Sequence, residues 1–395
     1  MCLLHHIAGA FTQKPEELRD NIGAKAGDLI KRSFDDIDPA RLLDYHTHVA
    51  GLGKGGSGAF VNPKMLAWRH PFHRLKFKVY LSAGAVTDVE AADQQIVLRL
   101  ASLISHIEDH GKHRLLAFDK NYNRDGTPNL AKTEFYVPND YVFTLAEQQP
   151  DCFEPAISVN PYRPDALAEL ERGAKRGARM VKWLPNAMGI DPADGQCDPF
   201  YQKMRELDLV LLSHGGEEKA VEAEEDQKLG NPLLLRRPLD HGVKVIIAHC
   251  AGLGDNEDLD DPQRQRWPNF DLFLRLMDEK RYEGLLFADI SAMTQYNRTG
   301  RPLTTILQRE DLHERLVNGS DYPLPAINVL IRTGALRKQG YITSDERSWL
   351  NEIYDYNPLL FDFALKRAIK VPGTERRLPA RIFMANAMLE DGRPV

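Results

Sequence analysis

Eight short apolar runs, separated by segments with helical spacing, constrain the fold of this chain more than any other feature. Most of these runs are apolar at nearly every position, which is typical of parallel strands that are buried on both faces. Alternating strands and helices favour a parallel α/β sheet. The runs cover residues 42–46, 114–118, 155–159, 178–184, 209–214, 243–249, 284–290 and 315–319.

Eight such repeats within about 300 residues favour closure into a (β/α)₈ TIM barrel over an open sheet. Three further features are predicted: an N-terminal helix within 12–38, a loop and helical insertion at 51–113 after the first strand, and closing helices at 343–370. The predicted organisation is therefore an N-terminal helical extension (1–40), the barrel (41–370) and a C-terminal tail (371–395).

Composition excludes several classes of partner. The formal net charge is −6, and basic residues are scattered among acidic ones, so we expect no nucleic acid partner. No apolar run approaches the roughly 20 residues that cross a bilayer, so we expect no membrane partner. The four cysteines are widely separated, which fits a reducing compartment, and we expect a cytoplasmic protein. The mildly apolar start MCLLHHIAGAF leaves a trimmed secretory signal open as an alternative.

Residues that bind metals or form carbamates lie at the ends of several predicted strands. Barrel enzymes place their chemistry at the C-terminal ends of the strands. In the first strand, His46 and His48 lie two residues apart and face the same way, as two ligands of zinc or manganese would. A single residue of this kind is often a core residue with a local hydrogen-bond partner. Six such residues at the ends of five strands are harder to explain in that way. The later members are Lys182, His214, His249 and Asp321.

This ordered set, in the segments YHTHV, VKWLP, LSHGG, IAHCAG and GSDYP, resembles the amidohydrolase superfamily of metal-dependent hydrolases. The resemblance spans roughly residues 40–365 and is strongest to the amidohydrolase-related branch, family two. It implies that His46, His48 and Asp321 bind one metal ion. It also implies that Lys182, carboxylated by CO₂, bridges to a second ion held by His214 and His249.

The resemblance leaves the reaction open. The expected cofactors are one or two Zn²⁺ ions, or Mn²⁺, and a carbamate on Lys182. A metal-activated hydroxide would then attack an amide, lactone or ester carbonyl, and Asp321 would transfer the proton. Some members of the branch are instead mononuclear decarboxylases of aromatic or unsaturated acids and lack the bridging lysine. If the register of the fourth strand slips by one residue, Trp183 would face inward in place of Lys182. A barrel that only binds or scaffolds is a third class, which requires a site without metal.

The substrate is expected to be a small molecule bound by the loops that follow the strands. Lys54, in the glycine-rich GLGKGGSG loop, could contact an anionic group, although a solvated loop explains it as well. Arg298 and Arg301 could hold a carboxylate, and surface solvation is the alternative. Trp183 and Asn186 could line the pocket or simply pack the strand end. The N-terminal helix and the insertion offer surfaces for a homodimer.

Overall fold

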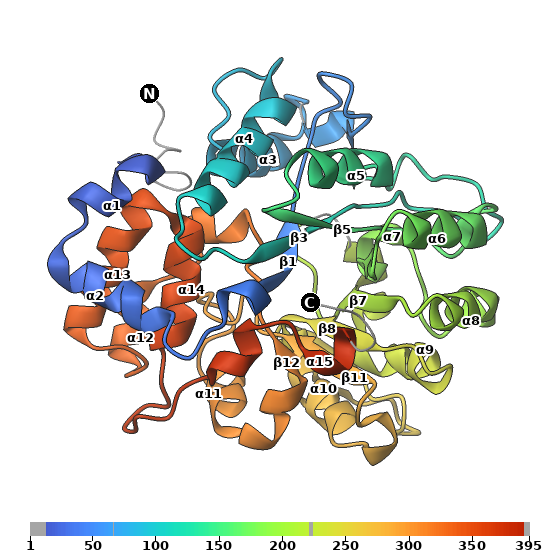
Figure 1. The fold of residues 1–395 in the computed structure, drawn as a ribbon. Coiled ribbons are helices and arrows are strands. Elements are labelled where there is room, and N and C mark those ends of the chain that lie inside the picture. The colour runs from blue at the N-terminus through green and yellow to red at the C-terminus, as the bar shows by residue number, and fades with distance from the viewer. Residues whose placement is uncertain (1–12, 66, 221–223, 391–395) are drawn as a thin grey trace. The chain divides into compact units, whose positions relative to one another are not determined.

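The computed structural model describes residues 13–65, 67–220 and 224–390 (Figure 1). The chain divides into two compact units. The predicted signal segment lies outside the described residues. Unit 1 comprises the described residues within 1–48, 66–113 and 291–395, and unit 2 comprises those within 49–65 and 114–290.

Unit 2 contains a run of parallel strands with a buried, apolar centre. The neighbour order is β3-β5 and β6-β7-β8-β11, and a parallel bridge between Ile157 and Val181 joins the two groups. Every residue of β6, β7, β8 and β11 is buried, as the continuous apolar runs predict. The strands are β3 (Lys112–Leu116), β5 (Phe153–Ala156), β6 (Met180–Trp183), β7 (Val210–His214), β8 (Val245–Ala248) and β11 (Leu286–Asp289).

Helices alternate with these strands along unit 2. In α6 the buried residues Ala166, Leu170 and Gly173 recur at intervals of four and three, so one stripe of the helix packs inward. The helices are α5 (Asn139–Gln148), α6 (Ala166–Lys175), α7 (Pro185–Met188), α8 (Asp198–Glu206), α9 (Arg236–Asp240) and α10 (Asn269–Met277). Two antiparallel pairs accompany them: β2 (Phe60–Val61) with β4 (Phe135–Tyr136), and β9 (Asp255–Glu257) with β10 (Arg266–Pro268).

Unit 1 pairs the first strand with the segment that follows the last one. β1 (Leu43–His48) runs parallel to the chain beyond β12 (Leu316–Val317). Helix α13 begins with a capping box between Thr343 and Glu346. The helices are α1 (Leu18–Asn21), α2 (Ala24–Ser33), α3 (Pro71–Ala83), α4 (Ala92–Ser105), α11 (Arg301–Gln308), α12 (Thr333–Lys338), α13 (Ser344–Tyr356), α14 (Pro358–Ala368) and α15 (Ala387–Glu390).

These eight parallel strands, with helices between them, are the elements of a (β/α)₈ barrel fold, as the sequence predicts. Each predicted apolar run overlaps one of these strands, although β1, β3 and β5 extend beyond the predicted bounds. The insertion after β1 holds α3 and α4, and the closing segment holds α13 and α14. The predicted N-terminal helix is present as α2, and the shorter α1 precedes it because the chain leaves the helical conformation at Ile22 and restarts after Gly23. The predicted boundaries at 40 and 370 stay predictions.

Among the described residues, no helix is long and apolar enough to cross a membrane.

Candidate metal centre

Three side chains of unit 1 converge on one point. His46 Nε2 lies 3.1 Å from His48 Nε2, and Asp321 Oδ1 lies 3.4 Å from the first nitrogen and 3.3 Å from the second. His46 and Asp321 are buried, whereas a quarter of the His48 side chain is exposed. The two histidines meet because alternate residues of β1 project to the same face. The structure thus brings together the three side chains that the sequence predicted as ligands of one metal ion, and their binding of metal stays a prediction.

Asp321 reaches the histidines through the pairing of its own segment with β1. Its backbone N–H donates to the His46 carbonyl at 2.7 Å, and the N–H of His48 donates to the Tyr322 carbonyl at 3.1 Å. Asp321 has a φ of 55°, in the left-handed region that non-glycine residues rarely adopt. Strained backbone of this kind clusters at functional sites. The local turn thus aims the carboxylate at the two imidazoles.

A second carboxylate, Asp44, joins the two segments that carry the candidate ligands. Its oxygens accept from the N–H of His46 at 2.8 Å and from the N–H of Ser320 at 3.0 and 3.1 Å. His113 Nδ1 lies 3.3 Å from it. Burial opposes its charge, but the hydrogen bonds from His113, Ser320 and His46 outweigh burial and lower the pKa of Asp44. Asp44 therefore fixes the spacing between β1 and the Asp321 turn.

The other ring nitrogen of His46 also has a partner. Ser291 Oγ lies 3.3 Å from His46 Nδ1, and both atoms are buried. Histidines that bind metals usually engage their second ring nitrogen in a hydrogen bond, which fixes the ring orientation. The contact with Ser291 directs Nε2 toward Asp321 and His48.

The donor set fits a divalent metal ion. Donors placed tetrahedrally at about 2.0–2.2 Å from zinc lie roughly 3.3–3.6 Å from one another. The three separations of 3.1–3.4 Å are close to this range. Two imidazoles and one carboxylate suit zinc and also manganese. Three protein ligands leave a coordination position for water or substrate, as in catalytic zinc sites.

In unit 2 the structure settles which way Lys182 faces. Trp183 packs against Phe200 and Tyr201 of α8, and its Nε1 donates to the Val159 carbonyl at 2.8 Å. Because neighbouring strand residues face opposite ways, Lys182 faces away from α8. Lys182 pairs in register with Leu212, so it shares a face with His214 two residues further on. The alternative register with Trp183 facing inward is absent from β6.

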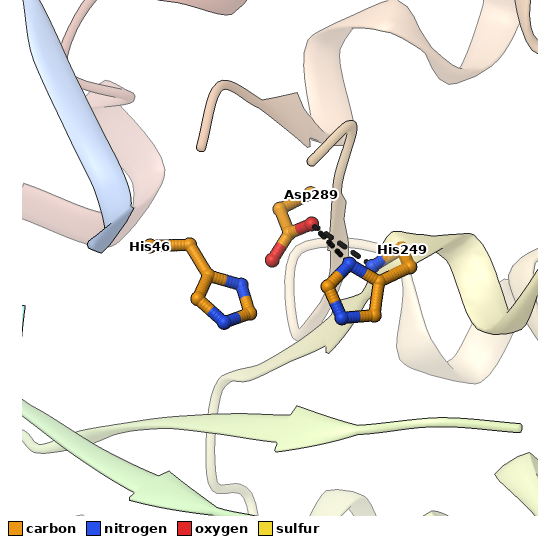
Figure 2. Close-up of side chains that lie close together, drawn as sticks. All are labelled: His46, His249 and Asp289. Carbon is orange, nitrogen blue, oxygen red and sulfur yellow. Dashed lines mark hydrogen bonds and ion pairs between the residues drawn. The ribbon is translucent and has the colours of Figure 1, made fainter. Parts of the chain in front are cut away.

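His214 is the last residue of β7 and His249 follows the neighbouring β8, and their ring centroids are 5.3 Å apart. Two buried carboxylates accompany them. Glu218 Oε2 lies 3.5 Å from His214 Nε2, and Asp289 Oδ1 accepts from the His249 N–H at 2.9 Å and lies 3.9 Å from its Nδ1 (Figure 2). Lys182, His214 and His249 thus lie at consecutive strand ends of one unit.

Glu218 and Asp289 are site candidates that the sequence prediction missed. Asp289 carried the same signal as the chosen residues, because it lies at the end of the apolar run GLLFADI. Glu218 lies beyond β7 in a loop, where apolar periodicity gives no signal.

The five candidate substrate residues occupy different environments. Asn186 Nδ2 donates to Gln227 Oε1 at 3.1 Å and to the Gly216 carbonyl at 3.3 Å, so it ties α7 to nearby loops. Arg298 is buried and donates to Gln295 Oε1 at 3.0 Å, whereas Arg301 is exposed at the start of α11. Lys54 is partly exposed in the glycine-rich loop, and Trp183 packs against α8. Their roles toward a substrate stay predictions.

Gly319 leaves no room for a side chain beside the candidate ligands. A Cβ at this position would lie 2.6 Å from the Cβ of His46 and 3.4 Å from that of Ser291. We expect Gly319→Ala to displace β1 or the Asp321 turn, which lowers metal affinity and costs about 1–3 kcal/mol of stability. Metal titration and chemical unfolding measure the two effects. Gly334→Ala is the control, because the nearest atom to its added Cβ lies 3.7 Å away; equal behaviour of the two variants would contradict the prediction.

Comparisons with known proteins place the chain among amidohydrolases. The amidohydrolase family model matches residues 125–341, more than half of the chain. This match contains Lys182, His214, His249, Asp289 and Asp321. No curated protein sequence matches significantly.

Several solved structures are distantly similar to this chain. A TIM-barrel protein from Bordetella bronchiseptica is 16% identical, with coverage of 73% of this chain and 88% of that chain and a TM-score of 0.48. A 5-carboxyvanillate decarboxylase from Novosphingobium aromaticivorans, with bound manganese, is 12% identical. The alignment covers 89% of this chain and 97% of that chain, with a TM-score of 0.47. N-isopropylammelide isopropylaminohydrolase from Burkholderia multivorans is 18% identical (75% and 70% coverage, TM-score 0.38). On the family match, this chain belongs to the amidohydrolase family.

Proposed function

We propose that this protein is a metal-dependent hydrolase that acts on an amide, lactone or ester carbonyl of a small molecule. The observation that carries the proposal is the convergence of His46, His48 and Asp321 within 3.1–3.4 Å of one another. Membership of an enzyme family supports a catalytic role for this cluster.

The residues of the cluster have separable tasks. His46, oriented by Ser291, and the more exposed His48 would hold the ion together with Asp321. A bound divalent ion would lower the pKa of water toward neutrality and polarise the substrate carbonyl. Asp321 is the group placed to accept the proton from water and to return it to the leaving group, because its Oδ1 already faces both imidazoles.

The residues of unit 2 support a second ion. His214 and His249 offer two imidazoles, and Lys182 is 2% exposed on the same face as His214. A buried lysine is costly unless it is paired or chemically altered. We propose that CO₂ converts Lys182 into a carbamate, which gives this face an anionic oxygen ligand. Zinc is the expected ion, with manganese as the alternative.

One observation favours a second candidate function, a mononuclear decarboxylase of an aromatic or unsaturated acid. The set of His46, His48 and Asp321 supplies three protein ligands by itself, which is sufficient for one ion. In that case His249, held by Asp289, would serve as a general acid rather than as a ligand.

Metal counting on a Lys182→Ala variant separates the two functions. For a binuclear hydrolase we expect about two ions per chain in the parent and about one in the variant, with hydrolysis lost. A carbamate signal in ¹³C NMR after growth with labelled bicarbonate should vanish in the variant. Lys203→Ala on α8 is the matched control, because the Lys203 side chain is partly exposed and pairs with Glu171 and Glu206.

The substrate assay completes the distinction. Amides, lactones and esters would be tested for hydrolysis, and aromatic and unsaturated acids for release of CO₂. One ion per chain with an unmodified Lys182 and CO₂ release would establish the decarboxylase. Full metal content and full hydrolytic activity in Lys182→Ala would refute the proposed carbamate ligand.

A further inference from the structure

Helix α3 presents an apolar ridge to solvent, the reverse of an ordinary surface helix. Phe72 is 84% exposed and Leu75 is 50% exposed, and Trp68, just before the helix, is 73% exposed. On the opposite side of the helix, Phe77 is buried. The interval of three between Phe72 and Leu75 places them on one face. We call Trp68, Phe72 and Leu75 the α3 ridge.

Basic residues flank this ridge on both sides. At 3.6 residues per turn, Lys76 lies on one side of the ridge, and Arg74 and Lys78 lie on the other. Arg69 adds an exposed guanidinium 5.5 Å from the centroid of the Trp68 ring. Between positions 45 and 87 the chain contains no aspartate or glutamate, although the whole protein has a formal net charge of −6. The segment that carries α3 is therefore positively charged, although the whole protein is negatively charged.

We propose that the α3 ridge docks on the surface of an anionic lipid bilayer. A helix with aromatic and leucine residues on one face and Lys/Arg beside them inserts its apolar face at the boundary between headgroups and acyl chains. Each nearby Lys or Arg adds attraction to anionic lipid, and a tryptophan suits this boundary because its ring is apolar with one polar N–H. Docking of this kind needs no spanning segment, and it replaces the expectation from the sequence that the protein has no membrane partner. It is independent of the metal centre.

The same charges disfavour a second copy of the chain as the occupant. In a two-fold dimer the same patch would face itself, so Arg69, Arg74 and Lys78 would meet their own copies. Like charges placed opposite one another raise the free energy of such an interface. An anionic bilayer would contact the α3 ridge with its acyl chains and the basic residues beside the ridge with its headgroups.

Co-sedimentation with vesicles tests the proposal. The full chain is mixed with vesicles of phosphatidylcholine alone or with phosphatidylglycerol added. We expect binding only to the anionic vesicles, weakened by salt, with a blue shift of tryptophan emission that Trp68→Phe removes. The triple variant R69E/R74E/K78E should bind on the order of 100-fold more weakly. The control K14E/R19E/K25E changes the net charge by the same amount at exposed sites of unit 1, and its vesicle binding should weaken far less.

A second pair of variants tests the apolar ridge. F72S/L75S should lose binding, whereas L167S/V329S, at exposed apolar positions elsewhere, should keep it. If both triple charge variants lost vesicle binding equally, the proposal that α3 is the binding site would be overturned. Absence of vesicle binding would also overturn the proposal. If the protein then forms a dimer by light scattering that F72S/L75S dissociates, a second copy covers the ridge instead.

Discussion

Replacing His46 by alanine should remove the metal ion of unit 1 and lower catalytic activity by more than about 100-fold. Loss of a residue that only supports a metal ligand typically costs 10- to 100-fold in affinity or activity, and loss of a ligand should exceed this. His46 is buried, and its Nε2 is within 3.4 Å of both other candidate ligands. Elemental analysis of the purified protein and assays at saturating metal measure the two effects.

The control for this variant is His106→Ala, which removes an exposed histidine at the end of α4. It should keep the parent's metal content and activity. Asp321→Asn adds a sharper test, because it preserves shape but removes the charge and the proton acceptor. A His46→Ala protein that keeps its metal and its activity while folded by circular dichroism would refute the assigned site.

Replacing Lys366 by methionine should destabilise the protein by about 3–5 kcal/mol, because it leaves a buried carboxylate without its cation. Lys366 Nζ lies 2.5 Å from Asp362 Oδ2 and donates to the Gly319 carbonyl at 2.6 Å. Both side chains are almost fully buried on α14. The contact with Gly319 connects this pair to the turn that carries Asp321. Chemical unfolding of parent and variant measures the loss.

The pH dependence of the variant's stability tests whether the unpaired Asp362 carboxylate causes the loss. Burial raises the pKa of Asp362 to about 6, against the opposing effect of Lys366. A carboxyl whose pKa is higher folded than unfolded favours folding below the unfolded value of 3.8, and this contribution is lost as the pH rises through the folded value. Without Lys366 the folded pKa rises further. The stability deficit of Lys366→Met should therefore be smallest near pH 4 and grow toward pH 7.

A double variant, D362L/K366M, should recover most of the lost stability, because an apolar pair of similar volume often equals or exceeds a buried ion pair. A deficit that does not depend on pH and persists in the double variant would contradict the assigned cause. It would point to lost packing or to the lost hydrogen bond to Gly319.

The order of strands and helices was predictable because buried parallel strands are continuously apolar. Helix boundaries were less predictable. The periodicity over 12–38 did not reveal the break at Ile22 and Gly23, because a glycine weakens a helix without always ending it. Asp289 was overlooked although it ends an apolar run. Glu218 was out of reach, because a loop residue meets His214 only through the path of the folded backbone.

By itself, the sequence determined the fold class and the chemical types of the candidate ligands, because strand periodicity and residue chemistry are local properties. It also placed His46 and His48 on one face of β1. Only the tertiary structure decided that Asp321 meets them, because this depends on parallel pairing across more than 270 residues, on the space left by Gly319 and on the hydrogen bonds of Asp44. It likewise decided that Trp183 packs on α8 and Lys182 faces the other way, since strand register is set by packing and not by composition.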